Sequence, residues 1–140
     1  MEDLSRLAAE HACAALITRY THLVDEGHAS QVADLFTADG VWGSPESTFD
    51  GREAIRAAFL RREKSGRRSR HVCTNVAIDV EDENHASGLC YLTLFRTDTD
   101  VTPPRGTTPD LVGVYRDRFV RTEDGWRFAS RTTEVSFVRG

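Results

Sequence analysis

The sequence predicts an α+β fold in which a curved sheet wraps around helices as a cone. The prediction depends on a change of hydrophobic period near the middle of the 140-residue chain. Apolar residues recur every three or four positions in the first half, which is typical of helices with one buried stripe, and alternate with polar residues in the second half, which is typical of strands. Helices followed by a long antiparallel run of strands favour a sheet that curls over the helices and encloses a pocket.

The first predicted element is a helix over residues 4–24. Its apolar side chains follow three- and four-residue steps, and Gly27 supplies a plausible stop after its last turn. The apolar positions of this predicted stripe are Leu4, Leu7, Ala8, Ala12, Ala15, Leu16, Tyr20 and Leu23.

A second, shorter helix is predicted from Ser30, which acts as N-cap, to Phe36. The polar residues 37–40 end in Gly40 and predict a turn into a short strand at 41–42.

The third predicted helix follows the turn signal Asp50-Gly51. Ile55, Ala58 and Phe59 give it an apolar edge, and Arg62 marks a basic end. The first half of the chain is therefore predicted to hold three helices and one strand.

Four strands are predicted in the second half. Their ranges are 72–80, 86–96, 111–121 and 126–137, with polar turns at 81–84 and 122–125. In the first of them, the apolar residues Val72, Val76, Ile78 and Val80 are predicted to share one face. The polar residues 97–110, rich in Thr, Pro and Asp, form either a mobile lid or an exposed loop.

Length and charge restrict the class of protein. The chain fits a single domain over residues 1–140, and its net charge of −4 argues against nucleic acid as a partner. Lys64 is its only lysine, within a basic stretch at 61–70. That stretch is interpreted either as a solvated helix end with its following loop or as a rim that recognises an anion.

Other sequence features concern location and cysteine chemistry. The chain contains no apolar run of about 18 residues and no signal-peptide pattern at its start, so we expect a cytoplasmic protein that does not insert into membranes. Cys13, Cys73 and Cys90 show no metal-ligand spacing and are interpreted as reduced core thiols, without a disulfide or a zinc ion.

Asp25 and His71 form the main candidate for chemistry. A carboxylate that holds one imidazole nitrogen leaves the other free to accept or donate a proton near neutral pH. Tyr20 precedes Asp25 by five residues, about 140° around a helix, so both line one cavity only if the helix breaks near Gly27.

Each candidate residue also has a structural interpretation. Asp25 could cap the second helix or pair with an arginine, and His71 could be an ordinary core or surface histidine. Tyr20 and Trp42 could be packing residues. Asn75 could satisfy neighbouring backbone groups.

Asp117 and Arg131, in the last two predicted strands, could form an interior ion pair instead of part of a site.

Several short segments together carry a family resemblance. In order they are Tyr20, Asp25, Leu35-Phe36-Thr37-Ala38-Asp39-Gly40-Val41-Trp42, Gly51-Arg52-Glu53-Ala54-Ile55, His71-Val72-Cys73-Thr74-Asn75, Gly113-Val114-Tyr115-Arg116-Asp117, Gly125-Trp126-Arg127-Phe128 and Arg131. In this order and spacing the chain resembles the SnoaL-like branch of the nuclear transport factor 2-like superfamily. The resemblance implies a cone-shaped α+β barrel, with three N-terminal helices packed in a curved mixed, mostly antiparallel sheet.

Within that superfamily the pattern is most similar to the group of scytalone dehydratase, hexachlorocyclohexane dehydrochlorinase and bile-acid 7α-dehydratase. The resemblance places their paired aspartate and histidine on Asp25 and His71. A tyrosine and an arginine of the bile-acid enzyme correspond to Tyr20 and Arg131. The chain departs from scytalone dehydratase because segment 90–95 offers no second active-site histidine.

The expected function is that of a cofactor-independent lyase or isomerase, dehydratase-like, acting on a small apolar oxygenated molecule such as a steroid, terpenoid or polyketide. Asp25 and His71 would act as an acid–base dyad with Tyr20 as hydrogen-bond donor, and no metal or cofactor is expected. Further substrate contacts are expected from Trp42, Asn75, Tyr115 and Arg131.

Two alternatives remain open. One is a non-catalytic binding or assembly module, such as a dioxygenase small subunit, and the other is a polyketide cyclase that uses Asp25 alone. Self-association into a homodimer or homotrimer is expected, since an open curved sheet exposes one broad face.

Overall fold

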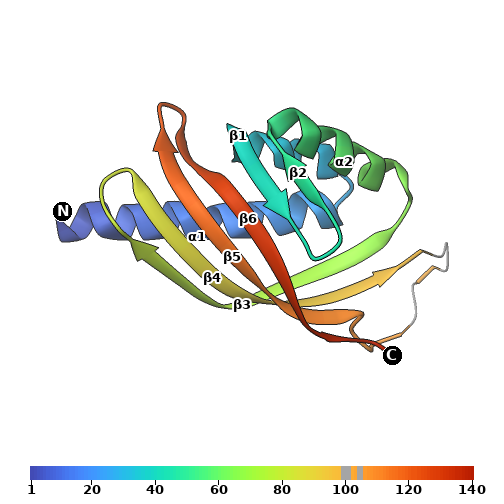
Figure 1. Cartoon of the computed structure of the whole chain (residues 1–140). Coiled ribbons are helices and arrows are strands. Elements are labelled where there is room, and N and C mark those ends of the chain that lie inside the picture. The colour runs from blue at the N-terminus through green and yellow to red at the C-terminus, as the bar shows by residue number, and fades with distance from the viewer. Residues whose placement is uncertain (99–101, 104–105) are drawn as a thin grey trace.

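The computed structural model describes residues 1–98, 102–103 and 106–140, and it confirms the predicted α+β fold (Figure 1). Part of the predicted 97–110 loop, including the question of whether it is a lid, lies outside the described residues. The elements in chain order are helix α1 (Asp3–Asp25), 3-10 helix η1 (Ala29–Leu35), β1 (Phe36–Gly43), β2 (Thr48–Asp50), α2 (Arg52–Lys64), β3 (Arg68–Val80), β4 (His85–Thr97), β5 (Leu111–Thr122) and β6 (Gly125–Val138).

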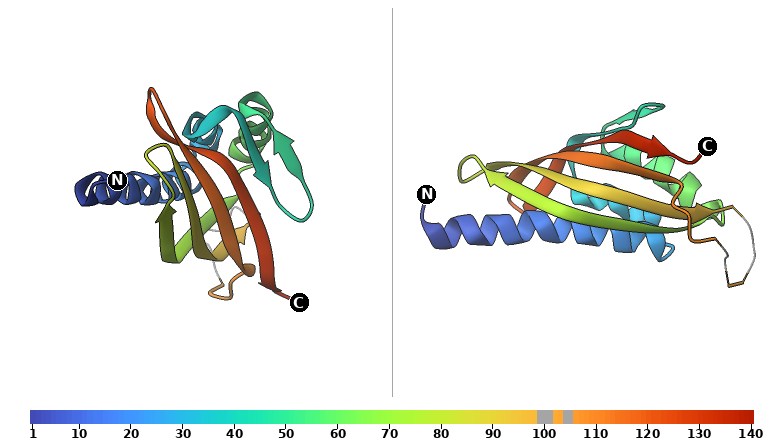
Figure 2. Two further views of the ribbon diagram at one scale, coloured as in Figure 1. Left: turned by 60° about the vertical axis from the view of Figure 1, so that its left-hand side comes forward. Right: turned by 90° about the horizontal axis from the view of Figure 1, so that it is seen from below.

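The six strands form one open sheet in the order β2-β1-β6-β5-β4-β3. All neighbouring pairs are antiparallel except β1 and β6, which run parallel and place Trp42 opposite Arg131. The long strands bend around α1, while α2 lies beside the short β1–β2 hairpin (Figures 1 and 2). The predicted cone and mixed sheet are confirmed, although the sheet does not close into a complete barrel.

The start of helix α1 differs from the predicted apolar stripe. Leu4 and Leu7 are 76% and 60% exposed, and the buried stripe begins at Ala9. The first turns lie beyond the curved part of the sheet, beside the β3–β4 hairpin, where Arg6 donates a hydrogen bond to the Val80 carbonyl at 3.1 Å (Figure 1). Periodicity alone cannot show where the covering sheet ends.

Strand β1 begins earlier than predicted. Residues 37–40, which we predicted as a turn, belong to the strand, and the Gly40 carbonyl accepts a hydrogen bond from the Gly51 amide at 2.7 Å. Strand β2 was not predicted, because three residues are too few for a periodic signal. The flanking residues Phe36 and Val41 pair with β6, whereas residues 37–40 between them form an irregular, bulged part of the strand.

Strand β3 contains a bulge that the predicted alternation missed. One extra residue lies between Thr74 and Ala77 relative to β4, and Asn75 adopts a positive φ of 54°. A bulge moves the following side chains to the other face of the strand. Val72, before the bulge, faces the side opposite to Ile78, and Val76 lies within the bulge. They are 43% and 44% exposed, although both were predicted to be buried with Ile78.

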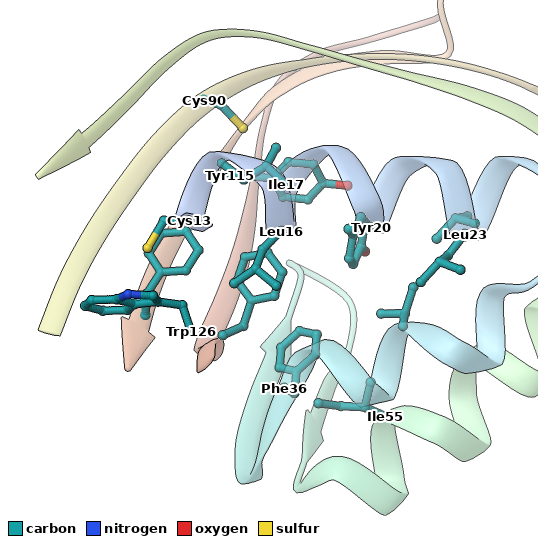
Figure 3. Packing of buried hydrophobic residues seen from close by; sticks show 14 of the residues in the cluster. Cys13, Leu16, Ile17, Tyr20, Leu23, Phe36, Ile55, Cys90, Tyr115 and Trp126 are labelled. Carbon is teal, nitrogen blue, oxygen red and sulfur yellow. The ribbon is translucent and has the colours of Figure 1, made fainter. Parts of the chain in front are cut away.

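The core lies between α1, the concave face of the sheet and α2. Figure 3 shows Leu16, Ile17, Phe36 and Ile55 packed between these layers. Tyr20 lies in the same cluster and marks the boundary between the packed core and the cavity described next.

None of the described helices is long and apolar enough to cross a bilayer.

Candidate active site

The structure brings Asp25 and His71 together at the end of α1. The Asp25 Oδ1 lies 2.7 Å from the His71 Nδ1, and the His71 backbone amide donates to Oδ2 at 2.9 Å. The Ser69 hydroxyl donates to Oδ1 at 2.7 Å. The Asp25 and His71 side chains are only 7% and 11% exposed, so the pair is largely shielded from water.

Asp25 stands behind His71 and does not share the cavity with Tyr20. Helix α1 continues unbroken to Asp25, and the positive φ at Gly27 comes only after the helix has ended. Five residues of intact helix separate the two side chains by about 140°. The helix break that would have placed both on one cavity is absent, so Asp25 reaches the cavity that Tyr20 lines through its hydrogen-bond partners His71 and Ser69, which both line it.

The cavity has a volume of about 600 Å³, within the range of small-molecule sites. Its wall combines the imidazole of His71 with aromatic side chains and with apolar residues of α1, α2, β4, β5 and β6. Of the predicted substrate contacts, Trp42 and Tyr115 line it, whereas Arg131 and Asn75 do not.

The pKa of Asp25 lies below the ordinary value of 3.8. Burial acts to raise it, but the hydrogen bonds from the His71 side chain and backbone and from Ser69 together outweigh burial. Asp25 is therefore a fixed negative charge at neutral pH and can hold the imidazole in one tautomer.

Tyr20 is buried, and its oxygen accepts a hydrogen bond from the Trp42 Nε1 at 3.0 Å. The ring centroids of Tyr20 and His71 are 6.4 Å apart in an edge-to-face arrangement. Burial raises the pKa of Tyr20, whereas the Arg131 cation and hydrogen bonds with Trp42 and Tyr115 lower it. The Tyr115 hydroxyl points toward Tyr20 (Figure 3).

Arg131 lies beneath the two tyrosines and forms a buried ion pair with Asp117. The Arg131 Nε is 3.0 Å from the Asp117 Oδ1, and both side chains are fully buried. The guanidinium carbon lies 3.6 Å from the Tyr115 ring centroid and 4.3 Å from that of Tyr20. Burial raises the pKa of Asp117 to about 6 despite Arg131, so the pair is charged at neutral pH.

Arg131 was predicted to contact the substrate. It instead lies behind the rings of Tyr20 and Tyr115, outside the cavity wall, and supports them from there. Asn75, predicted as another contact, is an exposed residue at the β3 bulge and lies outside the cavity wall. The bulge requires a positive φ at this position, and asparagine tolerates a positive φ better than most residues. This accounts for an asparagine at position 75 without a role in substrate binding.

Sequence reasoning missed Ser69 and the contact that joins it to Arg62, which was predicted only as part of the basic stretch 61–70. The Arg62 Nη2 donates to the Ser69 hydroxyl at 2.8 Å, and Ser69 in turn donates to Asp25. Ser69 precedes His71 by two residues and so lies on the same face of β3, which is a weak signal in the sequence.

The three cysteines are free thiols, with Cys13 and Cys90 buried and Cys73 partly buried. Across residues 1–98, 102–103 and 106–140, no three His, Cys, Asp or Glu side chains lie close enough to bind a metal ion.

Structural comparison shows the same fold in many solved proteins. A candidate scytalone dehydratase from Novosphingobium aromaticivorans superposes with a TM-score of 0.85 at 21% identity, covering 99% of this chain and 91% of that chain. LinA superposes with a TM-score of 0.80 at 20% identity, covering 98% and 92%. A Catenulispora acidiphila protein in complex with S-DNPA has a TM-score of 0.75 at 31% identity, covering 92% and 94%.

No curated protein matches the chain in sequence. The profile of the SnoaL-like domain, by contrast, matches residues 5–132, which is nearly the whole chain. The protein therefore belongs to the SnoaL-like domain family, within the nuclear transport factor 2-like superfamily.

Proposed function

We propose that this protein is a cofactor-independent lyase or isomerase in which His71 removes a proton from carbon. The observation that carries the proposal is a carboxylate–imidazole pair, 2.7 Å apart, whose imidazole lies at the wall of a largely apolar cavity. The cavity suits a small, largely apolar, oxygenated substrate of the steroid, terpenoid or polyketide type.

The geometry supports a simple division of roles. Asp25 occupies the His71 Nδ1, so Nε2 is the nitrogen that remains to accept a proton. When the imidazole becomes positively charged, the buried carboxylate stabilises it without itself being protonated. General base catalysis of this kind typically contributes about 10²- to 10⁴-fold to a rate.

Tyr20 is the candidate donor to a substrate oxygen. A tyrosine hydroxyl has one proton and two acceptor lone pairs. The Trp42 N–H donates to the oxygen, and the Tyr115 ring packs edge-to-face against the Tyr20 ring with centroids 5.9 Å apart. The Tyr20 proton can then be donated to a substrate oxygen that becomes negative during proton removal. The Arg131 guanidinium carbon lies 4.3 Å from the Tyr20 ring centroid and favours negative charge near that ring.

The comparisons add support at the level of reaction class. The structural relatives include a candidate scytalone dehydratase and LinA, a dehydrochlorinase. Dehydration and dehydrochlorination are both eliminations that begin by removing a proton beside a leaving group. At 20–21% identity these relatives share the fold, so the reaction is assigned here from the residues of the site.

The polyketide cyclase alternative, in which Asp25 works alone, is less favoured. Both Asp25 oxygens are engaged by His71 or Ser69, and the carboxylate does not line the 600 Å³ cavity. A non-catalytic binding module would need no proton transfer, so it gives no reason for an imidazole held by a carboxylate at the cavity wall. It is therefore also less favoured than the enzyme.

Deuterium exchange provides the decisive experiment, because it detects proton removal even when no leaving group is present. The purified chain is incubated in D₂O with a panel of cyclic ketones, β-hydroxy ketones and β-halo compounds, and label and elimination products are followed by mass spectrometry. We expect exchange or elimination with the wild type and its loss in His71→Ala. Activity retained in His71→Ala would refute the dyad, and binding without any exchange by the wild type would favour the binding module.

The chain offers a matched control for this experiment. His85 pairs with Asp82 through its Nδ1 at 2.9 Å, in the same way as His71 pairs with Asp25, but both side chains are exposed and lie outside the cavity. His85→Ala should leave exchange unchanged.

We also propose that the outer face of the sheet mediates self-association, as a homodimer or homotrimer. Strand register places apolar side chains in a continuous region across β3 to β6, including Val72, Tyr91, Val112, Val114 and Phe137. Three of them are strongly exposed in the single chain. Sedimentation should show an oligomer that Tyr91→Lys dissociates, and a monomeric wild type would contradict this.

A further inference from the structure

Four arginines line the same cavity as His71. Arg61 and Arg62 come from the last turn of α2, Arg67 precedes β3, and Arg96 lies near the end of β4. Figure 1 shows that these ends of α2, β3 and β4 meet at the end of the molecule away from the N-terminus. Among the lining residues that the structure describes, Glu46 is the one acidic residue, so this mouth of the cavity is positively charged.

Among the described residues, three of the four arginines have no carboxylate partner. Arg67 pairs with Asp98 at 2.6 Å, but no ion pair within the described part of the chain includes Arg61, Arg62 or Arg96. Unpaired cations beside a low-dielectric wall attract anions strongly. The basic stretch 61–70 was predicted to be either a solvated helix end with its following loop or a rim that recognises an anion. Three of its arginines line the cavity, which favours the anion-recognising rim.

Arg62 is the most deeply placed of these cations. It is half-buried, and it uses two of its N–H donors for the Ser69 hydroxyl at 2.8 Å and the Arg67 carbonyl at 3.0 Å. Burial lowers its pKa, and the neighbouring Arg67 cation lowers it further. A guanidinium has five N–H donors in a rigid plane, so Arg62 retains donors for a carboxylate or similar oxyanion.

Arg96 lies close to the proposed base. It is the cross-strand partner of Ser69, which is buried and faces inward, and Leu94 is the partner of His71. Arg96 and His71 are therefore diagonal neighbours on one face of the sheet, and such pairs have Cβ atoms about 7 Å apart. A ligand of a few carbon atoms can contact both side chains at once.

We propose that the cavity binds an amphipathic acid, with its apolar body against the inner wall and an oxyanion, a carboxylate in the first instance, held by Arg62 and Arg96 at the mouth. Arg61 adds a third positive charge at the rim. As a statement about the substrate, this inference rests on the proposed function. It narrows the substrate class to acids whose reacting carbon lies within reach of His71 while the acid group contacts the arginines.

A matched pair of probes tests the proposal without turnover. Isothermal titration calorimetry compares 2-naphthoate with 2-naphthamide, which has a similar shape but no charge. We expect the acid to bind at least about tenfold more tightly, since one charge-assisted contact is worth roughly 1.4 kcal/mol. The preference should shrink as sodium chloride is raised. Equal affinities for the two probes, or no binding of the acid, would overturn the proposal.

Arginine variants locate the effect. Arg96→Gln should lower the affinity for 2-naphthoate about tenfold and leave 2-naphthamide unchanged, and Arg62→Gln should act in the same direction. Arg121→Gln removes an exposed arginine outside the cavity wall and should change neither affinity. Because Arg96 is exposed, its variant stays interpretable even if Arg62→Gln perturbs folding. An unchanged acid preference in both variants would contradict the assignment.

The outcomes separate this inference from the proposed function. Acid preference with no exchange or elimination by the wild type would support the anion site and refute the enzyme. Exchange of neutral ketones without any acid preference would support the enzyme and refute the anion site.

Discussion

The indole Nε1 of Trp42 donates a hydrogen bond to the Tyr20 hydroxyl oxygen at 3.0 Å, and so connects strand β1 to helix α1 at the cavity wall. Both residues line the cavity that contains His71. The two residues are 22 positions apart in the sequence. Their contact uses one acceptor lone pair of the Tyr20 oxygen and fixes the orientation of its hydroxyl. Tyr20, a residue of the buried stripe of α1, is thereby held at the cavity wall.

Tyr20→Phe should lower both stability and activity. Removal of the hydroxyl leaves the Trp42 N–H without its acceptor, which should cost about 1 kcal/mol in the free energy of unfolding. Loss of the donor to the substrate oxygen should lower kcat by at least about tenfold. Tyr91→Phe is the control, because it removes an exposed hydroxyl but keeps the ring that the proposed self-association uses. An unchanged kcat in Tyr20→Phe would reduce Tyr20 to a packing residue.

Asp25→Asn should lower kcat by about 10²- to 10⁴-fold while the fold is retained. The amide can still contact His71 and Ser69, but it cannot stabilise a charged imidazole as a carboxylate does. Steady-state kinetics and circular dichroism measure the two effects. Asp82→Asn removes the corresponding carboxylate from the exposed His85 pair and should leave kcat unchanged. Similar losses in both variants would indicate a general electrostatic effect.

The same substitution should reveal a pH dependence of stability. The folded-state pKa of Asp25 lies below its ordinary value of 3.8, because hydrogen bonds from His71 and Ser69 outweigh burial. Its contribution is therefore fully present above pH 3.8 and is lost as the pH falls through the lower folded value. Urea unfolding should show a gap between wild type and Asp25→Asn that closes in acid. A gap independent of pH would contradict this linkage.

Breaking the buried Asp117–Arg131 pair should be strongly destabilising. Arg131→Met leaves the Asp117 carboxylate buried without a partner, which typically costs about 3–5 kcal/mol. The double variant Asp117→Leu/Arg131→Met should lose much less than the sum of the single losses. As a control, Glu134→Gln breaks the exposed pair with Arg116 and should cost less than about 1 kcal/mol. Additive losses in urea unfolding would show that the buried pair is not coupled.

Gly113→Ala should destabilise the β5–β6 pair. A Cβ at this position would overlap the Glu134 carbonyl oxygen, and backbone can relieve the overlap only by moving apart. We expect a loss of about 1–3 kcal/mol in thermal or urea unfolding. Gly43→Ala is the matched strand control, because the nearest atom to its Cβ would be 3.9 Å away. Equal effects of the two substitutions would exclude the steric explanation.

The amino-acid sequence by itself determined the order of helices and strands and the two residues of the candidate dyad. Helical and strand periods are local properties, so the ranges of α1, α2 and the four long strands could be predicted to within a few residues. Asp25 and His71 stood out because a carboxylate and an imidazole are recognisable by type, and the family resemblance linked their positions. The exposure of Leu4 depends on where the sheet ends, and the bulge at residues 37–40 depends on the pairing of the flanking residues with β6, so neither could be predicted in this way.

Only the tertiary structure decided which residues meet in the site. The bulge at Asn75 changes the face of β3, the register of β3 with β4 sets Arg96 beside Ser69, and the intact end of α1 places Asp25 behind His71. The physical reason is that each relationship depends on backbone pairing between segments far apart in the chain, where a shift of one residue exchanges the inner and outer faces of a strand.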